Sequence, residues 1–225
     1  MPEGPVIWKD EELSPIRDKV YEYLKQAIVQ GIYKSGDRIV EREVAGQLNV
    51  SRTPIREALF RLESQGFVKT LPRRGVVVSK LSPEEIVEIF TILSATESLA
   101  MKLAAQRAEE PQRDKLRQII AEIEEALEHN VLREEHWRIH FKINAVVFEA
   151  ARSPRLQAMI DSLSEYVQAF VHLAYELPGR LRKAMEEHRD LARAVMEGEA
   201  DLAENLTKIH VENAKKAYLE VLAKE

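Results

Sequence analysis

The sequence predicts a mainly α-helical protein made of two parts. Apolar residues recur at helical spacing before residue 66 and again after residue 82, and β-rich runs occur only between these segments. Pro and Gly residues divide the later segment into successive helices. With 225 residues, of which 45% are hydrophobic, the chain can form proper cores. We expect a flexible N-terminus over 1–13, a small domain over 14–80 and a helical domain over 81–225.

The small domain is predicted to contain three helices and a hairpin. The first helix covers residues 14–30 and stops at Gly31, and two shorter helices follow in "EREVAGQLN" and "VSRTPIREALFRLESQG". Ser51 is expected to cap the third helix, and Pro54 falls in its first turn, where a missing N–H costs nothing. Two β-rich runs, 67–71 and 76–79, are joined by a Pro and Gly turn.

The second part reads as one helix after another, with no strand signal beyond residue 80. Its six helical patterns cover residues 82–108, 111–129, 133–151, 153–176, 178–198 and 199–223. The short breaks between them favour neighbouring helices that run antiparallel. We therefore predict an all-helical antiparallel bundle.

Composition excludes several classes of protein. The chain has no cysteine, so a disulfide framework and a thiolate metal site are both excluded. It has no run of eighteen apolar residues and no signal-like start. We expect a cytoplasmic protein without a membrane partner.

The net charge of −5 conceals an asymmetry between the two parts. Residues 1–80 carry 14 Lys+Arg against 11 Asp+Glu, whereas the remainder carries 19 against 27. Within 51–80 there are seven basic residues and two acidic ones. Because phosphate contacts act within roughly 8 to 10 Å, this local basic stretch matters more for a polyanionic partner than the net charge does.

The order of three helices and a basic hairpin is typical of a winged helix-turn-helix. Arg52 and Arg56 lie four residues apart near the start of the third helix, so they share a face that can enter the major groove. Arg73, Arg74 and Gly75 at the hairpin tip can reach an adjacent groove or the DNA backbone. A solvated helix surface is the alternative for an isolated arginine pair, but the surrounding pattern argues against it.

The stretch "DRIVEREVAGQLNVSRTPIREALFRLESQGFVKTLPRRGVVV" resembles the DNA-binding domain of GntR-family bacterial transcription regulators. The resemblance covers roughly residues 14–80, and it implies double-stranded operator DNA as the partner. The DNA contacts that it implies are Arg42, Arg52, Thr53, Arg56, Arg74 and Gly75.

Three helices of the second part each direct a histidine inward. Trp137, Phe141, Val147, Phe148 and Ala151 are expected to define the inner stripe of one helix, with His140 and Asn144 within it. His188 and His210 lie among apolar residues of two later helices. A lone inward histidine is usually a hydrogen-bonded core residue, but three that converge favour a metal site.

The order of these helices resembles the FadR-type effector domain, the FCD helical bundle, over residues 82–222. Anchoring on "EAARSPRL" places His140 and Asn144 where metal-binding members have Asp and His, and it aligns His188 and His210 with two further ligands. The resemblance implies a divalent transition metal, such as zinc, nickel or manganese, held by these four residues. His136, one turn earlier, could serve as a substitute ligand, but Glu135 and Arg138 beside it indicate that this part of the helix lies near solvent.

The identity of the effector is left open by two departures from that pattern. His140 and Asn144 are not the usual ligand types, so a metal-free site that binds an acyl-CoA or another organic effector is the alternative. Many members also carry an Arg four residues before the Glu that Glu97 matches, and this chain has Leu93. Arg189 or a bound metal could supply the positive charge that holds an effector carboxylate.

Together these features predict a homodimeric, ligand-responsive transcription regulator, a repressor released by a small metabolite. The rival from another class is a His-based metalloenzyme, because three histidines with an open position also suit hydrolytic zinc. No general base stands beside those histidines, and an enzyme has no use for the arginine array. We therefore predict that the chain is not an enzyme.

Overall fold

The computed structural model describes residues 14–171, 175 and 177–224. Its contacts divide the chain into two compact units whose boundary along the chain falls between Leu81 and Ser82. We call them the N-terminal unit and the helical unit. The predicted flexible segment 1–13 lies outside the described residues. None of the described helices is both long and apolar enough to cross a membrane.

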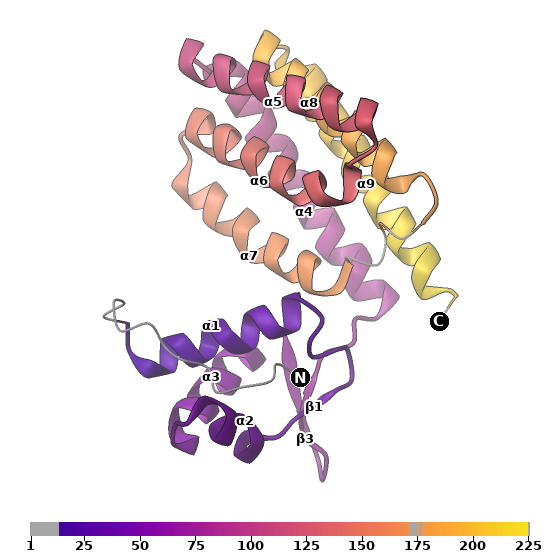
Figure 1. Ribbon diagram of the computed structural model, residues 1–225. Coiled ribbons are helices and arrows are strands. Elements are labelled where there is room, and N and C mark those ends of the chain that lie inside the picture. The colour runs from indigo at the N-terminus through magenta and orange to yellow at the C-terminus, as the bar shows by residue number, and fades with distance from the viewer. Residues whose placement is uncertain (1–13, 172–174, 176, 225) are drawn as a thin grey trace. The chain divides into compact units, whose positions relative to one another are not determined.

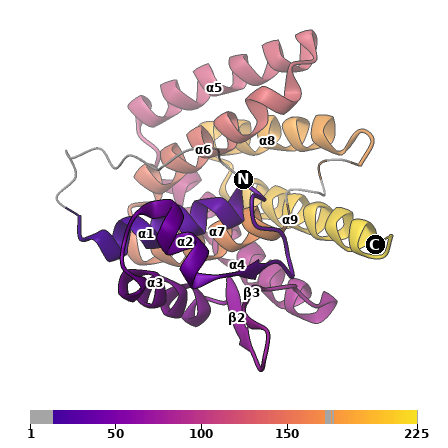
Figure 2. The same cartoon turned by 60° about the horizontal axis from the view of Figure 1, so that its bottom comes forward.

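The N-terminal unit combines three helices with a small antiparallel sheet (Figure 1). Its elements are α1 (Ile16–Val29), β1 (Arg38–Ile39), α2 (Glu41–Leu48), α3 (Arg52–Ser64), β2 (Val68–Leu71) and β3 (Gly75–Val78). The strand order is β1-β3-β2, and Leu71 pairs with Gly75 at the hairpin end. Figure 2 shows β2 and β3 as a narrow projecting hairpin. The three helices and the hairpin are as predicted.

One strand, β1, was not predicted. It contains only Arg38 and Ile39, which pair with Val77 and Val76 of β3. Two residues are too few for an alternating pattern to be visible in a sequence. The strand nevertheless matters, because it places the Arg38 side chain beside the hairpin.

The apolar stripes of the three helices meet in one core, where α1 packs against α3. Its fully buried side chains include Val20, Leu24, Ile28, Leu48, Ile55 and Leu62. Each contributes about 1.5–3 kcal/mol through the apolar area removed from water. This packing fixes α3 so that its opposite face stays exposed.

Backbone geometry explains the sharp turn between α2 and α3. Asn49 ends α2 in the left-handed region, with φ 51°, a conformation that Asn tolerates better than most residues. Ser51 occupies the N-cap position of α3 as expected, but its side chain makes no capping hydrogen bond. Pro54 lies buried in the first helical turn, where a backbone N–H has no intrahelical acceptor, so the missing N–H of proline costs nothing.

The helical unit contains six helices among the described residues, as predicted (Figure 1). They are α4 (Pro83–Arg107), α5 (Glu110–His129), α6 (Leu132–Ala151), α7 (Pro154–Val171), α8 (Arg180–Glu197) and α9 (Ala200–Leu222). A capping box joins Ser82 and Glu85 at the start of α4, which satisfies two of the free N–H groups there.

The rotation of α6 differs from the prediction. Phe141 was expected in the inner stripe, but 52% of it is exposed. The buried stripe of α6 is instead formed by Ile139, Ile143, Val146, Val147 and Ala150. His140 and Asn144 therefore lie at the edge of the stripe, where they can reach polar partners on neighbouring helices.

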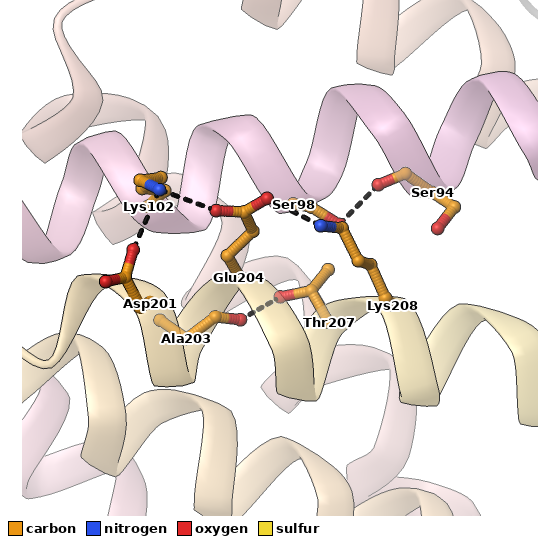
Figure 3. A network of polar contacts seen from close by, with 8 residues as sticks. All are labelled: Ser94, Ser98, Lys102, Asp201, Ala203, Glu204, Thr207 and Lys208. Carbon is orange, nitrogen blue, oxygen red and sulfur yellow. Dashed lines mark hydrogen bonds and ion pairs between the residues drawn. The ribbon is translucent and has the colours of Figure 1, made fainter.

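A polar seam joins α4 and α9, which pack side by side (Figure 3). The Lys102 ammonium donates to Asp201 at 2.8 Å and to Glu204 at 2.7 Å, and Lys208 donates to Glu204 at 2.6 Å. These alternating charges match only in one register of the two helices. They add little to stability, because exposed ion pairs are weak.

Candidate functional site

The exposed face of α3 presents two arginines held by one carboxylate. Arg52 Nη2 and Arg56 Nε donate to the same Oε2 of Glu41, at 2.9 and 2.8 Å. The two arginine side chains are 58% and 62% exposed. Glu41 begins α2, so the contact also ties the two helices of the helix-turn-helix together. The guanidinium groups are therefore oriented before any nucleic acid arrives.

Glu41 remains charged while it holds these arginines. Burial alone would raise its pKa, but the hydrogen bonds from Arg52 and Arg56 outweigh burial, and the pKa is lowered. To contact Arg52 or Arg56, a DNA phosphate would have to displace the Glu41 carboxylate. Glu41 would then compete with DNA for the two arginines.

The other predicted DNA contacts lie on the same unit. Arg42 and Thr53 are exposed on α2 and α3, and Arg74 is exposed at the hairpin turn. Gly75 has φ +74°, a conformation that glycine adopts without strain. A Cβ built at Gly75 would lie 3.6 Å from Nε of Arg38, so the Arg38 side chain covers the hairpin backbone. Sequence reasoning missed Arg38, because β1 itself was not visible.

In the helical unit the four predicted ligand residues come together. His140 Nδ1 lies 3.3 Å from Nε2 of His188, and Asn144 Nδ2 lies 3.1 Å from Nε2 of His140. The rings of His188 and His210 have centroids 4.7 Å apart. Residues from α6, α8 and α9 thus form one polar cluster, which we call the histidine site.

The hydrogen bonds within the histidine site fix the proton positions of two neutral imidazoles. The Asn144 amide group donates to Nε2 of His140, so His140 carries its proton on Nδ1 and donates it to His188. Because His188 accepts at Nε2, its own proton is on Nδ1. That atom is buried and has no partner among the described residues. The histidine site therefore contains a buried N–H that lacks an acceptor among the described residues.

Glu187 orients the third histidine. Its Oε2 accepts from Nδ1 of His210 at 2.7 Å and from Nη1 of Arg180 at 3.1 Å, while its Oε1 accepts from Asn213 at 2.7 Å. Burial acts to raise the pKa of Glu187, but the hydrogen bond and charge of His210, with Arg180 and Asn213, lower it. Sequence reasoning missed Glu187 and Arg180. The "EEH" sequence signalled only His188, although the Glu before it turns toward the same site.

His136 was predicted near solvent, and that prediction was wrong. Only 1% of it is exposed, and its ring lies 5.4 Å from that of His188 and 4.3 Å from that of Tyr175, between centroids. The reason is the rotation of α6 described above, which brings residue 136 into line with Ile139 and Ile143. Neither nitrogen of His136 has a partner among the described residues.

These histidines are neutral at physiological pH. Burial, followed by the charge of neighbouring groups, lowers the pKa of His136 to about 3 and that of His140 to about 4. The same causes lower the pKa of His188 well below its usual value. Burial also raises the pKa of Glu97, on α4, to about 7. His136, His140 and His188 can therefore offer hydrogen bonds without carrying a positive charge.

Comparison with known protein families agrees with the two units. The profile of the bacterial regulatory proteins of the gntR family matches residues 16–78, and the FCD domain profile matches residues 88–213. The chain belongs to the gntR family and carries an FCD domain. It is therefore a bacterial DNA-binding transcription regulator and not an enzyme, as predicted.

Individual relatives span nearly the whole regulator. The HTH-type transcriptional regulator YdhC of Bacillus subtilis is 27% identical over 203 residues, covering 90% of this chain and 91% of YdhC. The HTH-type transcriptional repressor RspR of Escherichia coli is 24% identical over 198 residues, covering 88% and 86%. The solved structure of McbR from E. coli shares the fold, with a TM-score of 0.73, 23% identity and coverage of 93% and 100%.

The FCD domain of this regulator does not arrange its predicted ligands for a metal. In the described part of the chain, no group of three or more His, Asp or Glu side chains is spaced to hold an ion. Both nitrogens of His140 are engaged in hydrogen bonds within the site, and Nε2 of His188 accepts one of them. A metal needs lone pairs that converge, and these lone pairs already face N–H donors.

The predicted effector contact of this regulator is paired with its neighbour in the chain. Arg189 donates from Nε and Nη2 to the adjacent Asp190, at 3.0 and 2.9 Å, and its side chain is partly exposed. Leu93 is buried in the core of the bundle. The cation that contacts the site is Arg180, through Glu187.

Proposed function

We propose that this regulator is a repressor, acting in the bacterial cytoplasm, that leaves its operator when a small metabolite binds at the histidine site. The name of the relative RspR supports repression. The observation that carries the ligand proposal is the set of buried nitrogens at His136 and at Nδ1 of His188, which have no partner in the described part of the chain. Unpaired buried polar atoms each cost about 1–3 kcal/mol, and a ligand that pairs them recovers that energy.

The DNA contacts that we propose are those of the helix-turn-helix and the hairpin. Arg52, Thr53 and Arg56 enter the major groove, Arg42 reaches the phosphates, and Arg74 with Gly75 contacts the adjacent groove. The high exposure of both arginines on α3 supports this proposal. We add Arg38, whose guanidinium covers Gly75, as a phosphate contact.

Direct binding of an organic effector is the chemistry that the donor geometry favours at the histidine site. A metal is the second candidate, because His140 Nδ1 and His188 Nε2 are 3.3 Å apart, close to the separation of two nitrogens bound to one tetrahedral zinc at about 2.0–2.1 Å. Metal binding through these two atoms would require His140 to move its proton from Nδ1 to Nε2, and His210 to supply a further ligand nitrogen. Elemental analysis of the purified protein distinguishes the two candidates.

A homodimer is the assembly that we propose for operator binding. Ile92 and Leu99 on α4, with Leu202 and Ile209 on α9, expose large apolar side chains on the outer faces of two helices that pack together. A second copy of the chain would cover them in a symmetric interface, and two N-terminal units would then read two half-sites. Sedimentation of wild type and Leu99→Asp tests this: the variant should sediment as a monomer.

The proposed function is tested by titrating the regulator onto a duplex taken from the neighbourhood of its own gene. Metabolites of the enzymes encoded beside it are then added, and DNA release is followed by fluorescence anisotropy. We expect one of them to release the wild type, and His188→Ala to bind DNA normally but to resist release. Equal release of both proteins would overturn the histidine site as the effector site.

A further inference from the structure

A cavity lies on the surface of the helical unit, between the start of α8 and the end of α9. Its volume is about 460 Å³, and the residues used below are Gly179, Arg180, Lys183, Lys216, Glu220 and Lys224. Pockets of roughly 300–1,000 Å³ accommodate small organic ligands. We call this cavity the α8–α9 pocket.

The α8–α9 pocket is rich in positive charge. Four of its lining residues are Lys or Arg, whereas Glu220 is the acidic residue among them, and Glu220 is already paired with Lys224 at 2.7 Å. Lys183 has no ion-pair partner among the described residues, and Lys216 lies 3.7 Å from Glu212, a weak contact. An uncompensated cluster of this kind attracts an anion.

The backbone at the pocket adds donors. α8 begins directly after Gly179, and no side chain caps its first turn. The N–H of Arg180 already donates to the carbonyl of Leu177, but the next N–H groups of a first helical turn lack intrahelical partners, and the helix dipole favours negative charge there. Nothing lies within 4 Å of the position that a Cβ of Gly179 would occupy, so a ligand can approach the backbone closely.

Arg180 provides a second, independent sign of a ligand. Its side chain is only 7% exposed, although it lines the pocket. One guanidinium nitrogen pairs with Glu187, but Nε and Nη2 are buried and have no partner among the described residues. Two unsatisfied donors on a permanently charged group are costly, so the wall of the pocket holds a positive charge that a nearby anion would stabilise.

We infer that the α8–α9 pocket binds a small phosphorylated molecule, with its phosphate between Lys183, Lys216 and the first turn of α8. A phosphate dianion matches this arrangement of two lysine point charges and free backbone donors. The remaining volume accommodates a group of about sugar size. The pocket is distinct from the histidine site, but Arg180 and Asn213 line it and also hold Glu187. This inference does not depend on the proposed effector or operator.

The test uses isothermal titration calorimetry of the full chain with inorganic phosphate, with glucose 6-phosphate and with glucose. Ionic strength is held constant with sodium chloride, at a pH where phosphate is mostly a dianion. We expect both phosphates to bind and glucose not to bind. Replacing Lys183 and Lys216 by Ala should weaken binding about tenfold for each lysine removed, since each charge-assisted hydrogen bond is worth roughly one decade of affinity.

The matched control is Lys115→Ala, an exposed lysine of α5 outside the pocket, which should leave phosphate binding unchanged. Succinate provides the second control, and it should bind more weakly than phosphate. The inference is overturned if phosphate produces no more binding heat than chloride, or if the double lysine variant binds it as tightly as wild type does. Tighter binding of succinate would overturn the phosphate assignment.

Discussion

The Glu187 carboxylate accepts a hydrogen bond of 2.7 Å from Nδ1 of His210, and the same oxygen accepts one from Arg180. This contact makes Nδ1 of His210 the donor toward Glu187. It also neutralises an arginine that is almost entirely buried. One carboxylate thus joins the histidine site to the α8–α9 pocket.

Removal of Glu187 should therefore be costly. Glu187→Ala leaves the buried Arg180 without a counter-charge, and we expect a loss of about 3–5 kcal/mol in the free energy of unfolding of the helical unit. Urea denaturation followed by fluorescence of Trp137 measures it. The matched control is Glu186→Ala, because Glu186 is exposed and pairs loosely with Arg182 at 3.6 Å; it should change stability by less than about 0.5 kcal/mol. Equal losses of unfolding free energy in the two variants would contradict the burial of the Arg180–Glu187 ion pair.

The buried histidines should make stability depend on pH. Burial lowers the pKa of His136 to about 3 and that of His140 to about 4, whereas an unfolded histidine titrates near 6.5. As the pH falls below about 6.5, the unfolded chain binds protons that the folded chain does not bind. The free energy of unfolding therefore falls by about 1.4 kcal/mol per pH unit for each such histidine. Urea midpoints measured from pH 7 to pH 5 test this.

A matched pair of variants isolates the histidine contribution to that slope. His136→Leu should flatten the pH dependence, since it removes one buried titrating group. His129→Leu should leave it unchanged, because His129 is exposed. A wild-type stability that is constant over this range would contradict the burial of His136.

The rotation of α6 gives a further test. Ile143 is almost fully buried, whereas Phe141 is half exposed. Ile143→Ala should lower the free energy of unfolding by about 2–5 kcal/mol through lost burial and a cavity. Phe141→Ala should cost much less, because about half of Phe141 is exposed to water. A larger loss for Phe141→Ala than for Ile143→Ala would instead support the inner stripe that the sequence predicted.

The sequence predicted the helices, the hairpin and the convergence of His140, His188 and His210, because helical periodicity and inward polar residues are local signals. It did not predict β1, which has too few residues for a pattern, nor the burial of His136. The error at His136 arose because its charged neighbours in the chain, Glu135 and Arg138, project to the other side of α6. The roles of Arg180 and Glu187 depend on contacts between α8 and α9, which no local pattern encodes.

Replacing Glu41 should change the affinity for DNA. Its carboxylate holds both Arg52 and Arg56, so a phosphate must compete with it. Glu41→Gln removes one negative charge from the DNA-facing side, and we expect tighter binding to nonspecific duplex, with the operator preference reduced. Anisotropy titrations with operator and scrambled duplexes measure the ratio. Weaker binding to both duplexes would instead mean that the carboxylate's orienting role outweighs its competition.

The most direct test of the regulator's DNA-binding face is the salt dependence of operator affinity. Each phosphate contact lowers log K by about 0.9 for every unit of log salt concentration. Arg52→Ala and Arg56→Ala should each weaken operator binding by about 1–3 kcal/mol and reduce operator preference where the arginine reads a base. Where it contacts a phosphate, the salt slope should fall by about one. Arg117→Ala, an exposed arginine of α5, should change neither quantity. Wild-type affinity and slope in both α3 variants would contradict the DNA-binding face proposed for α3.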